Sequence, residues 1–163
     1  MVEKVGERMN DAVFSSKSID WETPQDFFDA LNRRFGFSLD VCATRETAKC
    51  PHFFDKSMNG LAQSWANHRC WMNPPYGRGV SGIAAWVEKA RREAEQGALV
   101  VGLLPARTDT RWWQEHVHGH ADVRFVARRL RFGNATTGAP FPSAVAVWWG
   151  WDVMGGGFTA KKA

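Results

Sequence analysis

The tetrapeptide Asn73-Pro74-Pro75-Tyr76 carries the side chains of this sequence that are best suited to chemistry on a planar amino group. The Asn73 side-chain carbonyl offers one hydrogen-bond acceptor, and a backbone carbonyl held by fixed proline torsions offers a second. Two acceptors match the two hydrogens of an exocyclic –NH2 group, and bonding both leaves the nitrogen lone pair available to attack an electrophile. Tyr76 adds an aromatic face for a flat base. The tetrapeptide predicts amine methylation, although the same residues could simply end a strand and pack Tyr76 in the core.

The segments around the tetrapeptide alternate between helical and strand patterns. Thr23 is predicted to cap the first helix, with Pro24 at its first position and Gly36 at its end. Apolar spacing predicts helices over residues 24–35, 82–96 and 110–118. Strands are predicted over residues 37–43, 70–72 and 98–104, and a long hairpin over the β-rich runs 123–132 and 143–149.

This order of elements predicts an α/β fold with a mostly parallel sheet and a C-terminal β-hairpin. Ligands of such sheets bind at the carboxyl ends of the strands, where residues 40–43, 73–76 and 105–108 are expected to meet. Methyl transfer to a weak amine needs an activated donor, and the biological one is S-adenosylmethionine. Asp40 could bind the ammonium group of this donor, and Asn59 could contact its adenine edge. The alternative for Asp40 is a carboxylate that caps a helix or a loop.

The length of 163 residues predicts one domain. We expect a flexible N-terminal segment at 1–18, a single domain at 19–152 and a flexible tail at 153–163. The composition is 44% hydrophobic, and no apolar run approaches the ~18 residues of a membrane span. The first 18 residues contain no apolar signal core, so a cytoplasmic protein without a membrane partner is expected.

Cysteine and histidine pairs raise the question of a metal site. The patterns Cys50-x-His52 and His68-x-Cys70 could in principle supply two cysteines and two histidines. Zinc ligand pairs are usually separated by two or more residues, so these spacings do not match. No metal is therefore expected, and the three cysteines are expected to be reduced thiols.

The charge of the chain is mildly positive, at +4, but four arginines and no acid fall between residues 124 and 131. A basic stripe favours a phosphate-bearing partner, although each arginine could equally belong to a solvated strand face. The predicted DNA contacts are Arg78, Arg107, Thr108, Arg111, Arg128, Arg129 and Arg131.

An ordered series of motifs from residue 20 to about residue 149 resembles the compact, phage-type DNA N6-adenine methyltransferase (Dam) family. The motifs are Trp21-x-Thr23-Pro24, Leu39-Asp40-Val41-Cys42-Ala43, Ala48-Lys49-Cys50, Gly60-Leu61 with Trp65, Asn73-Pro74-Pro75-Tyr76, Leu103 to Thr110, Arg129 to Gly133 and Ala139 to Ser143. The match is far more specific than the tetrapeptide alone.

The resemblance implies an S-adenosylmethionine-dependent enzyme with a Rossmann-like class I methyltransferase fold. It implies a flipped adenine of double-stranded DNA held by Asn73, Pro74, Pro75 and Tyr76, because a stacked base cannot reach such a site. The implied cofactor-binding residues are Trp21, Thr23, Pro24, Asp40, Val41, Cys42, Ala43, Asn59 and Leu61. The family usually has an acidic residue where this chain has Asn59, so we expect a weaker or altered cofactor contact.

Other substrates and roles remain open at this point. The same tetrapeptide could act on an RNA adenine or on a protein glutamine, and a non-catalytic nucleic-acid-binding module could keep the fold. Little chain is left for a separate recognition domain, so the loops 77–82 and 133–140, or a second subunit, would read the sequence. A monomer or a homodimer in the cytoplasm of a bacterial or phage-infected cell fits these expectations.

Overall fold

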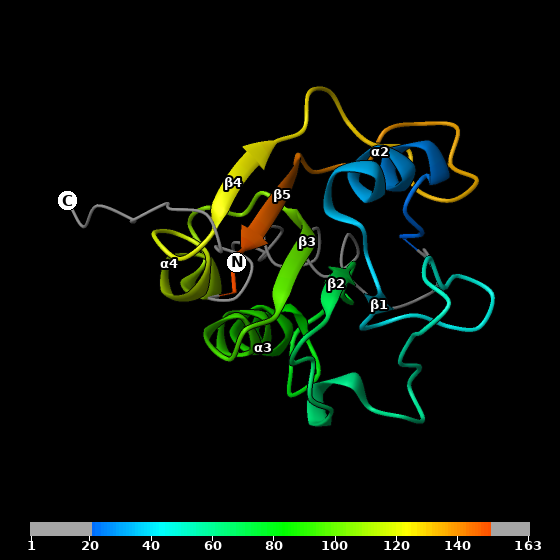
Figure 1. Cartoon of the computed structure of the whole chain (residues 1–163). Coiled ribbons are helices and arrows are strands. Elements are labelled where there is room, and N and C mark those ends of the chain that lie inside the picture. The colour runs from blue at the N-terminus through cyan, green and yellow to red at the C-terminus, as the bar shows by residue number, and fades with distance from the viewer. Residues whose placement is uncertain (1–20, 151–163) are drawn as a thin grey trace, which may run out of the picture.

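The computed structural model describes residues 21–150, which form one five-stranded sheet with helices packed against it (Figure 1). The predicted flexible segments 1–18 and 153–163 lie outside the described residues. The elements are α2 (Gln25–Phe35), β1 (Leu39–Asp40), the 3-10 helix η1 (Gly60–Ala62), β2 (Arg69–Met72), α3 (Ile83–Glu95), β3 (Leu99–Pro105), α4 (Arg111–His116), β4 (Asp122–Phe125) and β5 (Ser143–Trp148).

The sheet has the strand order β1-β2-β3-β5-β4. Strands β1, β2 and β3 run parallel, whereas β5 is antiparallel to both of its neighbours, β3 and β4. The prediction of an α/β fold with a mostly parallel sheet is therefore confirmed. None of the helices among residues 21–150 is long and apolar enough to cross a membrane.

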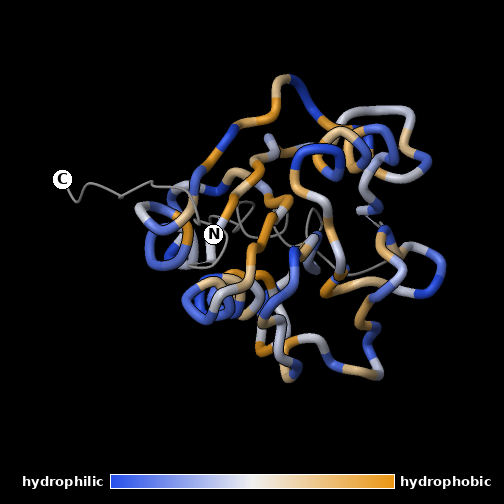
Figure 2. Tube along the Cα trace, viewed as in Figure 1, coloured by the Kyte–Doolittle hydropathy of each residue, from blue (hydrophilic) through white to orange (hydrophobic). Residues whose placement is uncertain are grey.

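Strand β3 forms the centre of the core, and all seven of its residues are buried. Figure 2 shows hydrophobic residues along the central strands and hydrophilic residues on the outer turns. A Cβ atom on Gly102 would lie 2.9 Å from Met72 Cε and 3.1 Å from Trp148 Cζ3, so side chains from both neighbouring strands close over this glycine. The strand is covered on both faces, as its continuous apolar sequence predicts.

Helices α2 and α3 pack against opposite faces of the sheet. Phe28 of α2 meets Trp71 of β2 edge-on, with 5.5 Å between ring centroids. The adjacent residue Cys70 points to the other face, where the charge of Glu93 on α3 contributes to raising the pKa of its thiol after burial, the main cause. Successive side chains of a strand alternate between faces, so β2 alone separates the two helices here.

The start of α2 differs from the prediction, but its end does not. Pro24, rather than Thr23, is the N-cap residue, and no side chain caps the helix. The Thr23 hydroxyl instead accepts a hydrogen bond from the side chain of Asn73. Gly36 ends the helix as predicted, with a left-handed φ of 62° that suits glycine.

Two predicted strands are shorter in the structure. Strand β1 covers only Leu39–Asp40 of the predicted 37–43, although an isolated parallel bridge joins Asp40 to Phe53 on its outer side. Strand β4 ends at Phe125 instead of residue 132. The backbone N–H of Val126 still donates to Ser143, but Arg128 has a left-handed φ of 65°, which turns the chain away from β5. Residues 126–142 form a long connection that we call the β4–β5 connection.

Candidate active site

The carboxyl ends of β1, β2 and β3 lie at one edge of the sheet. In the parallel register, Asp40 faces Trp71, and Met72 faces Gly102. Asn73 therefore follows the end of β2 beside the end of β1. The structure brings Asp40 and Asn73 to the same edge, because neighbouring parallel strands end together.

The side-chain amide of Asn73 is fixed by three hydrogen-bonding groups. Its Nδ2 donates to the backbone carbonyl of Trp21 at 2.5 Å and to Thr23 Oγ1 at 3.1 Å. Its Oδ1 accepts from the hydroxyl of Tyr76 at 2.9 Å. The orientation of the amide is thereby determined, with the oxygen directed away from Trp21. A carbonyl oxygen has two lone pairs, so Oδ1 can still accept a second hydrogen bond.

Tyr76 is buried, and its hydroxyl lies between two acceptors. The hydroxyl is 2.9 Å from Asn73 Oδ1 and 3.1 Å from the backbone carbonyl of Leu103 on β3. It carries one proton, so it donates to one of these oxygens at a time. Burial is the main cause that raises the pKa of Tyr76 well above its ordinary value, and the nearby Cys42 adds to it. The phenol therefore stays protonated and remains a donor at physiological pH.

Four rings pack together beside Asn73, and we call them the aromatic box: Trp21, Tyr76, Phe132 and Phe141. The indole of Trp21 stacks on Tyr76 with 6.3 Å between centroids and 26° between planes. Phe132 and Phe141 meet the Trp21 ring edge-on, at 5.3 and 5.0 Å. The Tyr76 ring, which was predicted to present a face to a base, is thus packed against Trp21. Sequence reasoning assigned no role to Phe132 and Phe141, although each lies in a matched motif of the β4–β5 connection.

Asp40 is a buried carboxylate at the end of β1. Its Oδ2 accepts the backbone N–H of Lys49 at 3.0 Å, and its Oδ1 accepts that of Cys42 at 3.4 Å. Burial raises the pKa of Asp40 to about 6, against the opposing effect of these two N–H groups and the Lys49 charge. The carboxylate is therefore ionised at neutral pH in a site that disfavours the negative charge.

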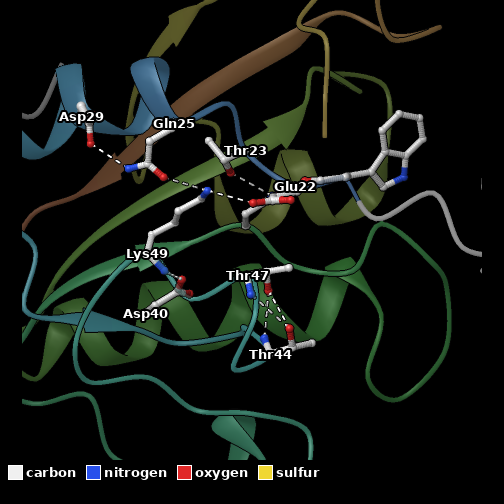
Figure 3. A network of polar contacts seen from close by, with 10 residues as sticks. Glu22, Thr23, Gln25, Asp29, Asp40, Thr44, Thr47 and Lys49 are labelled. Atoms are coloured by element: carbon white, nitrogen blue, oxygen red, sulfur yellow. Dashed lines mark hydrogen bonds and ion pairs between the residues drawn. The ribbon is translucent and has the colours of Figure 1, made fainter. Parts of the chain in front are cut away.

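The ammonium group of Lys49 is directed away from Asp40. It donates to Glu22 Oε1 and to Gln25 Oε1, each at 3.1 Å, and Gln25 in turn donates to Asp29 (Figure 3). The backbone of Lys49 holds Asp40, while its side chain holds the start of α2. Lys49 thus links the predicted cofactor residues at β1 to the segment that contains Trp21 and Thr23.

The remaining predicted cofactor residues are placed around the end of β1. Val41 is buried, whereas Cys42 and Ala43 are partly exposed. A Cβ atom on Gly60 would lie 2.2 Å from the Val41 carbonyl oxygen, so the backbone between Asn59 and Leu61 packs directly on this end. Asn59 itself is exposed and has a left-handed φ of 51°, a conformation that asparagine tolerates. Pro24 immediately precedes α2.

The predicted DNA contacts come from three parts of the chain: the loop after Tyr76, the segment from β3 to α4, and the β4–β5 connection. Arg107 and Thr108 follow β3, and burial lowers the pKa of Arg107, with Arg78 lowering it further by repulsion and Asp109 opposing both. Arg111 donates to Glu115 Oε1 at 2.7 Å within α4, so its guanidinium already has a carboxylate partner. The other three predicted contacts are exposed on the β4–β5 connection: Arg128, Arg129 and Arg131.

The cysteines and histidines do not assemble a metal site in the part of the chain that the structure describes. Within residues 21–150, no three His, Cys, Asp or Glu side chains are placed to hold a metal ion. Cys50 and Cys70 are buried, and burial raises the pKa of Cys50 to about 12, so its thiol stays protonated. His68 Nδ1 instead forms a hydrogen bond with Ser38 Oγ, at 3.2 Å.

Comparison with known proteins identifies the family. The family model "DNA N-6-adenine-methyltransferase (Dam)" matches residues 13–147. The DNA N-6-adenine-methyltransferase of Escherichia phage T1 is 32% identical over 112 residues, which cover 68% of this chain and 45% of the phage protein. The DNA N-6-adenine-methyltransferase of Haemophilus phage HP1 is 28% identical over 121 residues, which cover 72% of this chain and 68% of that protein. The chain thus spans about half the length of the phage T1 relative. The resemblance found in the sequence is confirmed, and the chain belongs to the DNA N-6-adenine-methyltransferase (Dam) family.

Proposed function

We propose that the chain transfers a methyl group from S-adenosylmethionine to the N6 amino group of adenine in double-stranded DNA. The observation that carries the proposal is the fixed amide of Asn73, which keeps a lone pair of Oδ1 available at the edge of the sheet beside the aromatic box. The names of the phage relatives, DNA N-6-adenine-methyltransferase, support DNA adenine as the substrate.

Asn73 and the proline that follows it act on the amino group of the base. Oδ1 accepts one N6 hydrogen, and the backbone carbonyl of Pro74 accepts the other. The cofactor would supply the methyl group. The N6 nitrogen would become positively charged as its lone pair bonds the methyl carbon and the methyl–sulfur bond breaks, and one N6 proton would then pass to solvent to leave the neutral product. Two oxygens fixed beside this nitrogen stabilise that charge without any reorganisation of their own. The hydrogen bonds from Asn73 Nδ2 to Trp21 and Thr23 keep the amide from rotating.

The aromatic box takes the target base once the base has left the duplex. Indole and purine are both flat fused rings of similar size, so the space that accommodates Trp21 against Tyr76 suits an adenine. The base stacks on Tyr76, and the indole of Trp21 moves aside while Asn73 keeps hold of the Trp21 carbonyl. Phe132 and Phe141 line the box edge-on. The base must be flipped out to reach this position.

The residues at the end of β1 fit a cationic cofactor. When bound, S-adenosylmethionine supplies an electrophilic methyl group. Asp40 is a buried carboxylate whose pKa is raised to about 6, so a positively charged ammonium group beside it would relieve an unfavourable charge. Asn59 is held on Val41 through Gly60 and has an exposed amide that can bond an adenine edge. The Rossmann-like class I arrangement implied by the family agrees with this position at the carboxyl ends of the parallel strands.

Labelled methyl transfer tests the substrate class. The protein is incubated with S-adenosylmethionine carrying a labelled methyl group and with duplex DNA, RNA or protein in separate reactions. We expect label in DNA only. Label in RNA or in protein glutamine would replace the DNA proposal with one of the rival substrates. Binding of S-adenosylmethionine without transfer to any of the three would instead indicate a non-catalytic module.

A further inference from the structure

An open pocket of about 770 Å³ lies where the β4–β5 connection passes the start of α2. Figure 1 shows this connection, in yellow to orange, running beside α2. One wall comes from consecutive residues of the connection and the other from the beginning of the helix. The lining includes Asp26, Phe27, Arg128, Arg129, Leu130 and Arg131.

The charge of the pocket is strongly positive. Its lining holds three arginines, at 128, 129 and 131, and one carboxylate, Asp26. Among residues 21–150, the structure gives none of these arginines an ion pair or a side-chain hydrogen bond. The helical arginines Arg92 and Arg111, by contrast, each pair with a glutamate one turn away. Asp26 Oδ1 accepts the backbone N–H of Phe27, so part of its acceptor capacity is already used.

The backbone that carries the arginines is braced. The N–H of Ala139 donates to the Leu130 carbonyl at 2.8 Å, and the N–H of Gly133 donates to Glu22 at 2.8 Å. A Cβ atom on Gly138 would lie 2.5 Å from Arg129 Cβ, so the two limbs of the connection touch there. Arg128 is held at a φ of 65°, which is costly for a residue other than glycine. Left-handed residues of this kind turn the chain and also cluster at ligand sites.

The same connection also contributes to the aromatic box. Arg131 is exposed, whereas the next residue, Phe132, is buried against Trp21. One short segment therefore points a cation outward and a ring toward the proposed base site. A DNA strand that delivers its base to the box must continue past this segment.

The walls of the pocket are not only cationic. Phe27 of α2 and Leu130 of the connection are partly buried and offer apolar surface in the pocket. Inorganic phosphate has no apolar part that could contact this surface, whereas the sugar and the flat base of a nucleotide can pack against it. The volume falls within the range of ~300–1,000 Å³ that is usual for small-ligand sites.

We propose that this pocket binds one nucleotide of the substrate strand that flanks the target adenine. The arginines jointly hold its phosphate, at the end of the pocket away from Asp26, and Phe27 and Leu130 contact its sugar or base. The inference rests on the proposed function, because it assumes that a DNA strand passes the aromatic box.

The salt dependence of DNA binding tests how many phosphates the arginines hold. Binding of a fluorescent duplex is measured by anisotropy over a range of salt concentrations for the wild type and for the triple variant Arg128→Gln, Arg129→Gln, Arg131→Gln. Each phosphate contact contributes about 0.9 to the slope of log K against log salt. One jointly held phosphate predicts a slope reduced by about 0.9, with binding weakened roughly tenfold at moderate salt. The matched control is Arg33→Gln, an exposed arginine at the other end of α2, which should change neither quantity.

Two results of this measurement would contradict the binding of one nucleotide in this pocket. A slope reduced by about 2.7 would mean three separate phosphates on an ordinary basic surface. An unchanged slope and affinity would mean that DNA does not reach these arginines. Anisotropy does not require methyl transfer, so the pocket is tested even if the proposed function fails. If the wild type methylates DNA but the triple variant leaves the salt slope unchanged, the pocket proposal fails and the proposed function stands.

The apolar wall and the source of the phosphate need their own measurements. Phe27→Leu removes the ring but keeps an apolar side chain, and we expect about fivefold weaker binding of a single-stranded oligonucleotide with an unchanged salt slope. Wild-type affinity in this variant would contradict contact with the sugar or base.

Competition with inorganic phosphate and with deoxyadenosine 5′-monophosphate distinguishes a phosphate of DNA from a free phosphate or a free nucleotide. Millimolar concentrations of either should leave DNA bound, and displacement by the mononucleotide at micromolar concentration would make this a free-nucleotide site instead.

Discussion

The side-chain amide of Asn73 donates a 2.5 Å hydrogen bond to the backbone carbonyl of Trp21, 52 positions earlier in the chain. This bond joins the residue after β2 to the segment before α2. It fixes the face of the amide that presents Oδ1, and it places the Trp21 indole over Tyr76. The proposed base site is therefore assembled from distant parts of the sequence, and its geometry depends on both.

The Tyr76 hydroxyl should contribute to stability and to the geometry of the amide, but not to stacking. Tyr76→Phe removes the hydroxyl that donates to Asn73 Oδ1 or to the Leu103 carbonyl, while keeping the ring. We expect a loss of about 1–2 kcal/mol in the free energy of unfolding, measured by urea denaturation, because buried acceptors lose a partner. Methyl transfer should fall moderately, whereas Tyr76→Ala should abolish it. Equal losses of transfer in the two variants would show that the ring itself is not used.

Trp21 should compete with the target base for the aromatic box. Trp21→Ala removes the indole that stacks on Tyr76, so a flipped base no longer has to displace it. We expect the fluorescence of 2-aminopurine at the target position to show stronger base extrusion at a given enzyme concentration, and the KM for DNA to fall.

Weaker base binding in Trp21→Ala would contradict this competition. If Trp21→Ala weakened base binding as severely as Tyr76→Ala, the indole would belong to the bound site instead of occupying it in the free protein. Trp112→Ala provides the control, because Trp112 is partly buried against Trp113 on α4, outside the box.

Much of the fold could be predicted from local patterns. The central strand β3 is a continuous apolar run, α3 has regular apolar spacing, and Gly36 ends α2, so local sequence determines these elements. The short extents of β1 and β4 could not be predicted in this way. Strand ends depend on partners distant in sequence, and the left-handed turn at Arg128 gives no local pattern.

The candidate site was only partly predictable for the same reason. Asn73 and Asp40 were placed at one edge because strand order follows from the alternation of elements. The use of Thr23 by Asn73, in place of helix capping, required knowledge of a contact across 50 positions. Phe132 and Phe141 join the box through the path of the β4–β5 connection, which no periodicity reveals.

Asp40 should make stability depend on pH. Its pKa in the folded protein is about 6, against an ordinary value of about 4 in the unfolded chain. The folded state therefore binds the proton more tightly, and the stability that this contributes is complete below about pH 4 and lost as the pH rises through 6. Asp40→Asn cannot titrate, so its stability relative to the wild type should rise by about 2 kcal/mol between pH 4 and pH 8. Urea denaturation at several pH values measures this difference, and a constant difference would refute the raised pKa.

Asn59 should limit cofactor affinity. Asn59→Asp introduces the acidic residue that the family resemblance implies at this position, and aspartate also tolerates the left-handed φ of 51°. A charged acceptor forms a hydrogen bond about twice as strong as a neutral one, so we expect about fivefold tighter binding of S-adenosylmethionine by calorimetry. Gln63→Glu adds the same charge nearby on a side chain that bonds Met58 O, and it should not tighten binding. Equal gains in the two variants would indicate a general charge effect and not a specific contact.

The nucleoside product formed by the wild type and by Asn73→Ala tests the central claim most directly. DNA incubated with S-adenosylmethionine and either protein is digested to nucleosides, and N6-methyladenine is quantified by mass spectrometry. We predict N6-methyladenine with the wild type and a loss of about 100-fold or more with Asn73→Ala, while Gln96→Ala, which removes an exposed amide at the end of α3, keeps full activity. Circular dichroism and cofactor binding establish that the Asn73 variant is folded. N6-methyladenine formed at the wild-type rate by folded Asn73→Ala would contradict the account.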